Sequence, residues 1–415
     1  MNAVIRRLSS GASGRAMGLG IAILAMLLAG ADWPQFRGPN SNSVAPSEQL
    51  PLEWSETQNT AWKVELPGRG PSSPIVVGNR VVVTCSSGIN QDRLHVLCFD
   101  AANGQKLWER QFWATGRTLT HPTSANAAPT PASDGKLIFA FYSCNDLICL
   151  DTEGNLKWLR GLAYDFPRAG NDVGMAASPV VIGQTVVVQI ESQGDSFATG
   201  IDTQTGETRW RVDRAPQPNW SSPIVMRGQT PGTDTVILQS PLMDTAHDPI
   251  SGKQRWALKR SCVTVASPAS DSGVAFLCSH GITAVRPTET HSEPTILWEK
   301  PKVQPSSASP LVHAGRLYVV NSSGVLACAD TTTGKLLWRL RLGGSFWGTP
   351  VLAGDRLYCI NQEGIASVVQ ISADEKPGKV VGTSQFGEAI LCSPAVANGA
   401  LYVRSERHLW KIASR

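Results

Sequence analysis

A serine or threonine followed directly by a proline recurs eight times along this 415-residue chain at nearly even spacing. From the first of these prolines to the last, seven intervals span 320 residues, a mean of about 46 residues per unit. A period in the forties is typical of β-propellers, in which each unit forms one blade of four strands. The eight dipeptides are Ser73-Pro74, Thr130-Pro131, Ser178-Pro179, Ser222-Pro223, Ser267-Pro268, Ser309-Pro310, Thr349-Pro350 and Ser393-Pro394.

One unit shows how the strands are expected to run. Hydrophobic segments at residues 310–312, 315–320, 324–330 and 336–338 are separated by small and turn-forming residues. The chain has 38 Gly and 27 Pro but only 17% charged residues, which also favours short strands joined by tight turns. We therefore predict an all-β fold, a single eight-bladed β-propeller of four-stranded antiparallel blades.

Most units contain an Asp, a Gly four or three residues later, and a Trp four residues after the Gly. An Asp can accept the backbone N–H groups of the turn that it opens, while Gly takes the positive φ that the turn needs. The fifth unit has Arg286-Pro287 in place of the Asp, and the seventh lacks these features near residues 378–381, so we expect the seventh blade to be the loosest. The tryptophans expected to dock against the neighbouring blade are Trp62, Trp108, Trp158, Trp210, Trp256, Trp298 and Trp338.

The last unit ends after its third strand, at residues 409–412, and a matching fourth strand is found near the start of the chain, at residues 60–66. Pairing the first strand with the last removes two exposed edges and closes the ring. We therefore assign residues 60–415 to one propeller and expect residues 32–59 to form an N-terminal extension that packs on it.

The first 31 residues have the pattern of an export signal. Arg6, Arg7 and Arg15 precede an apolar run at residues 16–30, which ends in Ala29-Gly30-Ala31. The run is shorter than the ~20 residues of a spanning helix, so we predict a signal peptide and a periplasmic or extracellular protein; a retained N-terminal anchor is the alternative. No later segment is apolar enough to span a membrane. The rest of the chain is nearly neutral, which argues against a nucleic-acid partner.

The units resemble the repeats of the quinoprotein-like family, also called PQQ-like repeats after pyrroloquinoline quinone. The resemblance covers residues 60–415 and is carried by stretches such as Leu317-Tyr318-Val319, Leu401-Tyr402-Val403 and Lys335-Leu336-Leu337-Trp338. Residues 32–40 are also similar to the mature start of exported bacterial members. The family implies an eight-bladed propeller, and it contains both quinone-dependent alcohol dehydrogenases and non-catalytic propellers, including the outer-membrane protein assembly propeller.

The enzymes of this family typically carry adjacent cysteines and a Ca²⁺ site built from acidic and Asn side chains. None of the nine cysteines here is adjacent to another, and no cluster of carboxylates suited to Ca²⁺ is evident. Cys98, Cys149 and Cys328 occupy one repeat position that holds a small residue such as Ala284 elsewhere, so we expect buried thiols, with disulfides as the alternative. We therefore expect no cofactor and no metal, and we keep a dehydrogenase with quinone and Ca²⁺ as an alternative.

Two connections between units are long. From Trp108 to Pro131 and from Trp158 to Pro179 the spacing is 23 and 21 residues, against 12 or 13 in five other units. Both inserts join an outer strand to the next inner strand, so both should emerge on one face of the ring, where they either cover it or form a ligand site. The candidate residues for a ligand or partner on this face are Trp113, Arg117, His121, Asn126, Tyr164, Asp165, Arg168, Asn171, Asp172, Trp220 and Trp347.

Aromatic side chains beside polar groups in a shallow funnel suit a ligand or a peptide. We predict an exported, non-catalytic, monomeric scaffold that binds a protein or a cell-envelope polymer through this face. A carbohydrate-binding or carbohydrate-cleaving propeller, with Asp165 and Asp172 as its carboxylates, is a further alternative. The eight Ser and Thr residues before Pro are expected to be structural hydroxyls at the starts of the inner strands.

Overall fold

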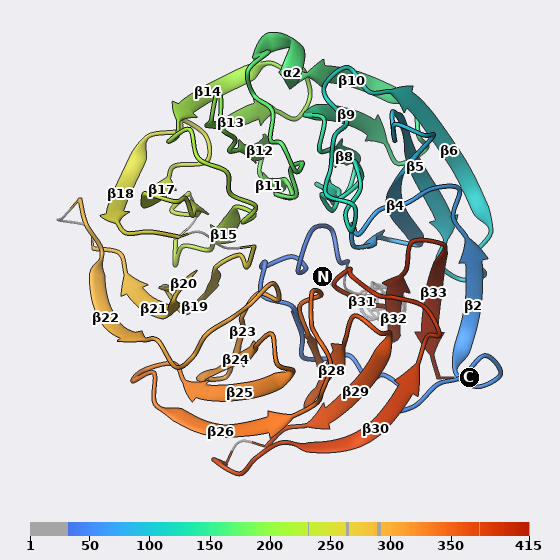
Figure 1. Ribbon diagram of the computed structural model, residues 1–415, viewed down its shortest axis with the longest axis vertical. Helices are drawn as coiled ribbons and strands as arrows, with labels where there is room; N and C mark the ends of the chain where they lie inside the picture. The colour runs from blue at the N-terminus through green and yellow to red at the C-terminus, as the bar shows by residue number, and fades with distance from the viewer. Residues whose placement is uncertain (1–31, 231, 263–264, 289–291, 373, 415) are drawn as a thin grey trace, which may run out of the picture.

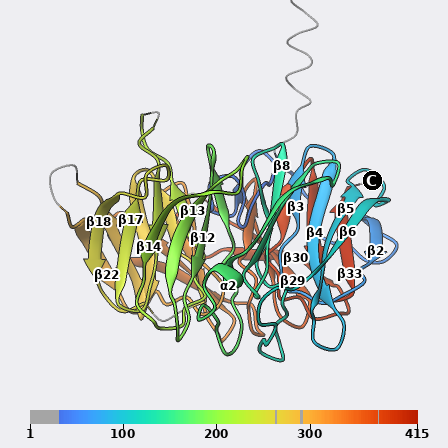
Figure 2. The same ribbon diagram turned by 90° about the horizontal axis from the view of Figure 1, so that it is seen from above.

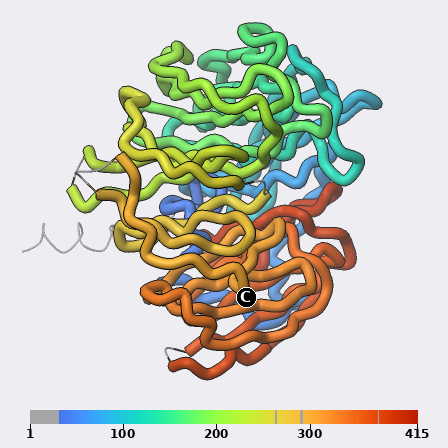
Figure 3. Tube along the Cα trace, turned by 60° about the vertical axis from the view of Figure 1, so that its left-hand side comes forward, coloured from blue at the N-terminus to red at the C-terminus, as the bar shows by residue number. Residues whose placement is uncertain are grey.

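The computed structural model describes residues 32–230, 232–262, 265–288, 292–372 and 374–414, and these form eight blades around a central axis (Figure 1). Figure 3 shows that the chain passes once around the ring, so the order of the blades follows the sequence. Seen from the edge, the strands of neighbouring blades stand side by side, with the loops gathered at the two faces (Figure 2). This is the predicted eight-bladed β-propeller; the predicted signal peptide lies outside the described residues.

Each blade is an antiparallel sheet whose first strand lies nearest the axis. Blade 1 consists of β3 (Ile75–Val77), β4 (Arg80–Ser87), β5 (Arg93–Asp100) and β6 (Lys106–Trp113), and blade 2 of β7 (Ala132–Ser133), β8 (Leu137–Phe141), β9 (Asp146–Asp151) and β10 (Leu156–Gly161). Blade 3 consists of β11 (Val180–Ile182), β12 (Thr185–Ile190), β13 (Phe197–Asp202) and β14 (Thr208–Asp213), and blade 4 of β15 (Ile224–Met226), β16 (Thr235–Leu238), β17 (Met243–His247) and β18 (Gln254–Lys259). Blade 5 consists of β19 (Ala269–Asp271), β20 (Val274–Ser279), β21 (Gly281–Arg286) and β22 (Thr295–Lys300), and blade 6 of β23 (Leu311–His313), β24 (Arg316–Val320), β25 (Val325–Asp330) and β26 (Leu336–Arg341). Blade 7 consists of β27 (Val351–Ala353), β28 (Arg356–Ile360), β29 (Ile365–Gln370) and β30 (Lys379–Gln385). A short helix, α2 (Leu162–Asp165), follows blade 2.

Blade 8 is built from both ends of the chain. β31 (Ala395–Ala397), β32 (Ala400–Arg404) and β33 (His408–Ala413) supply its inner three strands, and β2 (Thr60–Glu65) pairs antiparallel with β33 as the outermost one. In Figure 1 the blue β2 lies beside the red β33. The prediction that the first strand closes the last blade is therefore confirmed.

The Asp–Gly–Trp pattern joins five of the blades to their next neighbour by a tryptophan hydrogen bond among the described residues. In blade 1, Asp100 Oδ1 accepts the N–H of Ala102 at 2.7 Å, and Gly104 has a φ of 77°. A Cβ atom on Gly104 would lie 2.8 Å from the indole of Trp62, so the glycine also makes room for the tryptophan of blade 8. Trp62 Nε1 then donates to the carbonyl of Ala101 at 3.2 Å. The same donation to a turn carbonyl is made by Trp108, Trp158, Trp210 and Trp298.

Blade 5, where the turn lacks its Asp, breaks this pattern. Trp256 of blade 4 is buried, but within the described part of the chain its Nε1 has no hydrogen-bond acceptor. The indole packs in a cluster with neighbours such as Leu277 and Val285, and this packing is what holds it among the described residues.

Blade 7 is supported in a way that the sequence did not predict. β1 (Val44–Ala45) pairs in parallel with β27 and makes this a five-stranded sheet. Near the outer strand β30, the backbone N–H of Trp54 donates to Ser384 Oγ at 2.8 Å, and the Trp54 ring contacts Phe386. The expectation of a loose seventh blade overlooked this support from the N-terminal segment.

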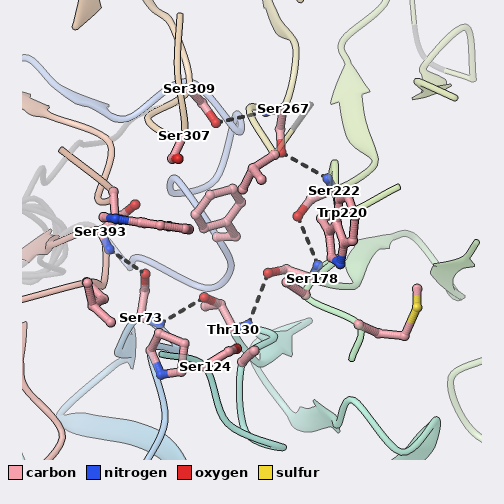
Figure 4. Close-up of a pocket in the computed structure, with 18 of the residues that line it drawn as sticks. Ser73, Ser124, Thr130, Ser178, Trp220, Ser222, Ser267, Ser307, Ser309 and Ser393 are labelled. Carbon is pink, nitrogen blue, oxygen red and sulfur yellow. Dashed lines mark hydrogen bonds between the residues drawn. The ribbon is translucent and has the colours of Figure 1, made fainter. Parts of the chain in front are cut away.

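The hydroxyls before the prolines form a closed ring of hydrogen bonds around the axis, and Figure 4 shows the part of it that runs from Ser309 to Ser393 by way of Ser178. Each buried hydroxyl oxygen accepts the backbone N–H of its counterpart in the preceding blade, at 2.9–3.1 Å, and Ser73 Oγ closes the circle by accepting the N–H of Ser393. We call these eight residues the hydroxyl ring: Ser73, Thr130, Ser178, Ser222, Ser267, Ser309, Thr349 and Ser393. Their expected structural role is the one that the contacts show.

Residues 32–48 fill the axis of the ring and bond to the inner part of every blade (Figure 1). Arg37 is buried and donates to the carbonyls of Pro268 and Pro310 in blades 5 and 6, at 2.6 and 2.5 Å. Burial lowers the pKa of Arg37 to about 10, which leaves it charged at neutral pH. The bonds to the other six blades involve Trp33 with Val76, Pro34 with Ser133, Gln35 with Val181, Pro39 with Arg227, Ser43 with Leu352 and Glu48 with Gly399.

The hydroxyl ring predicts a cost for removing one link. In Thr130→Val the side chain keeps its shape, but the buried N–H of Ser73 loses its acceptor, so the free energy of unfolding should fall by about 1–3 kcal/mol. Thr332→Val, at an exposed turn position, is the control and should change it by less than about 0.5 kcal/mol. Chemical denaturation followed by fluorescence measures both, and equal effects would show that the ring adds no stability.

The docking tryptophans predict a second difference. Trp210→Phe removes the hydrogen bond to the carbonyl of Pro249, whereas Trp256→Phe removes an N–H that has no acceptor among the described residues. Trp210→Phe should therefore destabilise the protein by about 1–2 kcal/mol more than Trp256→Phe. Melting curves of the two variants test this, and the reverse order would contradict the role given to the indole N–H.

Candidate functional site

A pocket of about 350 Å³ lies on the axis, at the face where each outermost strand leads into the innermost strand of the next blade. We call this side of the ring the pocket face. The hydroxyl ring surrounds the base of the pocket (Figure 4). The half-buried Phe36 of the N-terminal segment is part of the lining. The walls come from the connections between blades, so the pocket is a product of ring closure.

Two tryptophans on the walls are fixed by their indole N–H groups. Trp220 Nε1 donates to the carbonyl of Gly174 at 2.9 Å, and Trp347 Nε1 donates to Gln362 Oε1 at 3.1 Å. Trp347 is 41% exposed although it is bonded in this way, so its ring is held in place and is accessible. Rigid aromatic side chains of this kind lose little conformational entropy when a ligand packs on them.

The two inserts lie together on the pocket face, as their connections predict. The N–H of His121 donates to the carbonyl of Val173 at 2.9 Å, and Arg117 pairs with Asp172 at 2.8 Å, so the first insert is joined directly to the second. Of the eleven candidate residues, His121, Trp220 and Trp347 line the pocket.

The two candidate asparagines are buried and brace the loops. Asn126 donates to the carbonyl of Gln91 and accepts the N–H of Cys144, at 3.1 and 2.8 Å. Asn171 donates to the carbonyl of Glu191 at 3.3 Å and accepts the N–H of Val173. Neither side chain reaches the pocket lining.

The remaining candidates lie away from the pocket. Arg168 pairs with Asp195 at 2.7 Å, and Asp165 pairs with Arg160, so the charges of the inserts are matched within the protein. Trp113 is 64% exposed beneath Arg93, and Tyr164 on α2 is 84% exposed. Asp165 and Asp172 are the carboxylates of the carbohydrate-cleaving alternative, and each forms an ion pair with an arginine.

Several pocket residues carried no signal that the sequence analysis used. Phe36 comes from the segment before the first blade, and Met175, Val265 and Leu391 are single apolar residues in connections. Met175, Val265 and Leu391 lie four or five residues before an inner strand, which is the same property that singled out Trp220 and Trp347, whereas Phe36 does not. The same position in all eight units therefore points to Met175, Val265 and Leu391, and the repeat carries no signal for Phe36.

The lining of the pocket does not suit pyrroloquinoline quinone, a tricarboxylate. None of the described residues that line it is Lys, Arg, Asp or Glu, so the carboxylates of that quinone would be buried without a cation. The dehydrogenase alternative also requires a metal ion such as Ca²⁺ beside the quinone, and the described residues contain no group of three or more His, Cys, Asp or Glu side chains suited to a metal ion. The residues present therefore do not fit this cofactor, and we derive no reaction through it.

Two buried carboxylates elsewhere are already neutralised. Glu191 accepts from Arg214 Nε at 3.0 Å, and Asp244 lies 3.6 Å from Arg260. Burial raises the pKa of Asp244 to about 7, although Arg260 and Arg214 lower it. With an arginine against each carboxylate, this cluster offers no net negative charge to a divalent cation.

The nine cysteines are buried free thiols. Burial raises the pKa of Cys98, Cys149 and Cys359 to about 12, so these thiols are protonated and unreactive at neutral pH. They pack in the blades as small apolar side chains, which is the first of the two alternatives that the sequence left open.

Fold and repeat together define the class: an eight-bladed propeller of the PQQ-like type. The family model described as "Outer membrane protein assembly factor BamB" matches residues 52–197, 98–294 and 279–381, and so reaches from residue 52 to residue 381. The chain belongs to this family. No curated protein matches the chain.

Solved structures show the same fold at low sequence identity. BamB from Moraxella catarrhalis is 15% identical, with a TM-score of 0.60, over 86% of this chain and 97% of that one. A europium-containing methanol dehydrogenase is 14% identical, with a TM-score of 0.66, over 90% and 89%. Quinohemoprotein alcohol dehydrogenase from Comamonas testosteroni is 12% identical, with a TM-score of 0.65, over 92% and 81%. At these identities the likeness establishes the fold alone.

The cysteines give a chemical prediction. In the native protein at pH 8, a thiol reagent such as Ellman's should react with none of the nine cysteines within minutes, because the thiols are buried and protonated. After denaturation without reductant, all nine should react. A sample that is reduced before denaturation is the control. If more cysteines react in that sample than in the unreduced one, the protein contains disulfides and the assignment of nine free thiols is wrong.

Proposed function

We propose that this protein is a non-catalytic binding scaffold of the cell envelope, which holds an uncharged group of a partner in the pocket on its axis. The observation that carries the proposal is the pocket itself. Its lining combines Trp220, Trp347 and Phe36 with the hydroxyl ring and contains no charged side chain among the described residues. Aromatic surface with a few oriented polar groups is the chemistry of recognition.

The comparisons support the scaffold in preference to the enzyme. The matching family model is described as an assembly factor, and the pocket does not suit the quinone of the dehydrogenase alternative. We propose that the partner is another protein. The propeller that carries the pocket acts as a monomer.

Export completes the proposal. Residues 1–31 read as a signal peptide, and the family is one of outer-membrane assembly, so we place the mature protein in the periplasm. None of the helices among the described residues is long and apolar enough to cross a membrane.

Removing the two wall tryptophans tests the proposal. The double variant Trp220→Ala with Trp347→Ala should reduce the capture of partners from an envelope extract of the source cell at least about tenfold, because truncating an aromatic anchor in a binding site costs about 2 kcal/mol or more. Quantitative mass spectrometry after cross-linking measures the loss.

The matched control is the double variant Trp113→Ala with Tyr164→Ala, which removes two exposed aromatic rings outside the pocket lining. Its capture should equal that of the unmodified protein, and both variants should melt close to it. Undiminished capture by the pocket variant would remove the pocket from the function. Dye-linked alcohol oxidation on addition of quinone and Ca²⁺ would overturn the non-catalytic assignment.

A further inference from the structure

The pocket on the axis continues sideways into a second hollow. This groove, of about 510 Å³, lies at the pocket face and is lined by residues of the loops of blades 1, 7 and 8. Pro71, Thr123 and Leu391 line both hollows, so one bound molecule can occupy the two together. We call it the Arg407 groove.

Three arginines line the Arg407 groove, and the side chains of two of them are bonded within the protein. Arg69 pairs with Glu406 at 2.7 Å, and Glu388 contacts both His408 and Lys63, at 2.6 and 3.7 Å. Arg404, also in the lining, is fully buried, and its guanidinium donates to Ser72 Oγ and to the carbonyl of Thr84.

Arg407 is the groove's remaining cation. Its side chain is exposed and has no ion pair or hydrogen bond with any other described residue. The inserts on the same face have their charges matched internally, as in the pairs Arg117–Asp172 and Arg168–Asp195. An occupant of the groove therefore meets one unmatched positive charge, and a carboxylate complements it.

The pocket already accepts an aromatic side chain of this chain. Phe36 belongs to an irregular segment whose backbone bonds to the inner strands while its ring forms part of the pocket lining. The ring is only half-buried, so part of its surface is left for another group. An uncharged pocket of this size, at the small end of ligand sites, suits one large apolar side chain resting on Phe36 and between the walls.

We infer that the pocket face binds an extended segment of a partner protein, with a large apolar side chain in the pocket and an acidic side chain within a few positions at Arg407. This inference rests on the proposed function and names the chemistry of its partner. An extended peptide advances about 3.3 Å per residue, so a segment of a few residues can reach from one hollow into the other. A neutral sugar would fill the pocket but would leave Arg407 without a partner.

An array of synthetic peptides tests the inference. The peptides have a Ser-Gly background with one Phe and one Asp separated by one to five positions, which is about 3–17 Å in an extended chain. The full-length protein should bind best at one or two of these separations. Replacing Phe by Ala should weaken binding at least about tenfold, and replacing Asp by Lys should weaken it about three- to tenfold.

Two variants separate the contributions. Arg407→Gln should abolish the preference for Asp over Lys and keep the preference for Phe over Ala, whereas Trp220→Ala with Trp347→Ala should abolish the preference for Phe. Lys136→Gln, at an exposed position in the turn between β7 and β8 on the opposite face, is the control and should keep both preferences.

The outcomes distinguish this inference from the proposed function. If capture of envelope partners depends on the two tryptophans but no Phe–Asp peptide binds, the scaffold stands and the peptide inference fails. It also fails if Arg407→Gln leaves the preference for Asp unchanged. Binding of a neutral glycan panel that depends on Trp220 and Trp347 would replace the peptide by a carbohydrate.

Discussion

The closed circle of hydroxyl-to-amide hydrogen bonds around the axis sets the geometry of this protein. Every link spans two blades, because the acceptor on one blade receives the N–H of the blade before it. Each such bond contributes only about 1 kcal/mol, but the last link, from Ser393 to Ser73, forms only if the other blades have brought these residues together. The ring therefore fixes the mutual distance of the inner strands, and with it the width of the pocket.

An eight-bladed ring leaves an axial opening that must be filled, and the N-terminal segment fills it. A proline after each hydroxyl has no N–H to donate, yet its carbonyl still needs a donor, and Arg37 supplies donors to two of these carbonyls. A buried guanidinium is costly when it is unpaired, so the position of Arg37 ties the segment to the finished ring. The same segment presents Phe36 to the pocket, and this makes ring closure and the binding surface parts of one structure.

The sequence predicted the blades because their determinants are local and repeat eight times. Strand periodicity, the Asp–Gly turn and the docking tryptophan all lie within one unit. The closing strand is also recognisable, because no other strands of a repeat unit precede it in the sequence. The N-terminal segment was harder to place because residues 32–48 have no period, and Arg37 finds its acceptors more than 200 residues away. For the same reason the support of blade 7 by Trp54 and β1 could not be foreseen.

Some residues of the pocket were predicted, and the candidate residues that lie outside it were chosen for a common reason. Trp220 and Trp347 could be found since a large aromatic residue before an inner strand must lie near the axis. Asn126, Asn171 and the charged residues of the inserts were candidates because of their chemical type, but long loops need polar partners of their own. The two asparagines bond to backbone groups, and the charged side chains form ion pairs within the protein. Among the described residues that line the pocket and the Arg407 groove, Arg407 is the one exposed charge without an ion pair. Dehydrogenases and assembly factors share this fold, so the propeller alone does not specify a function, and the function that we propose rests on this distribution of charge.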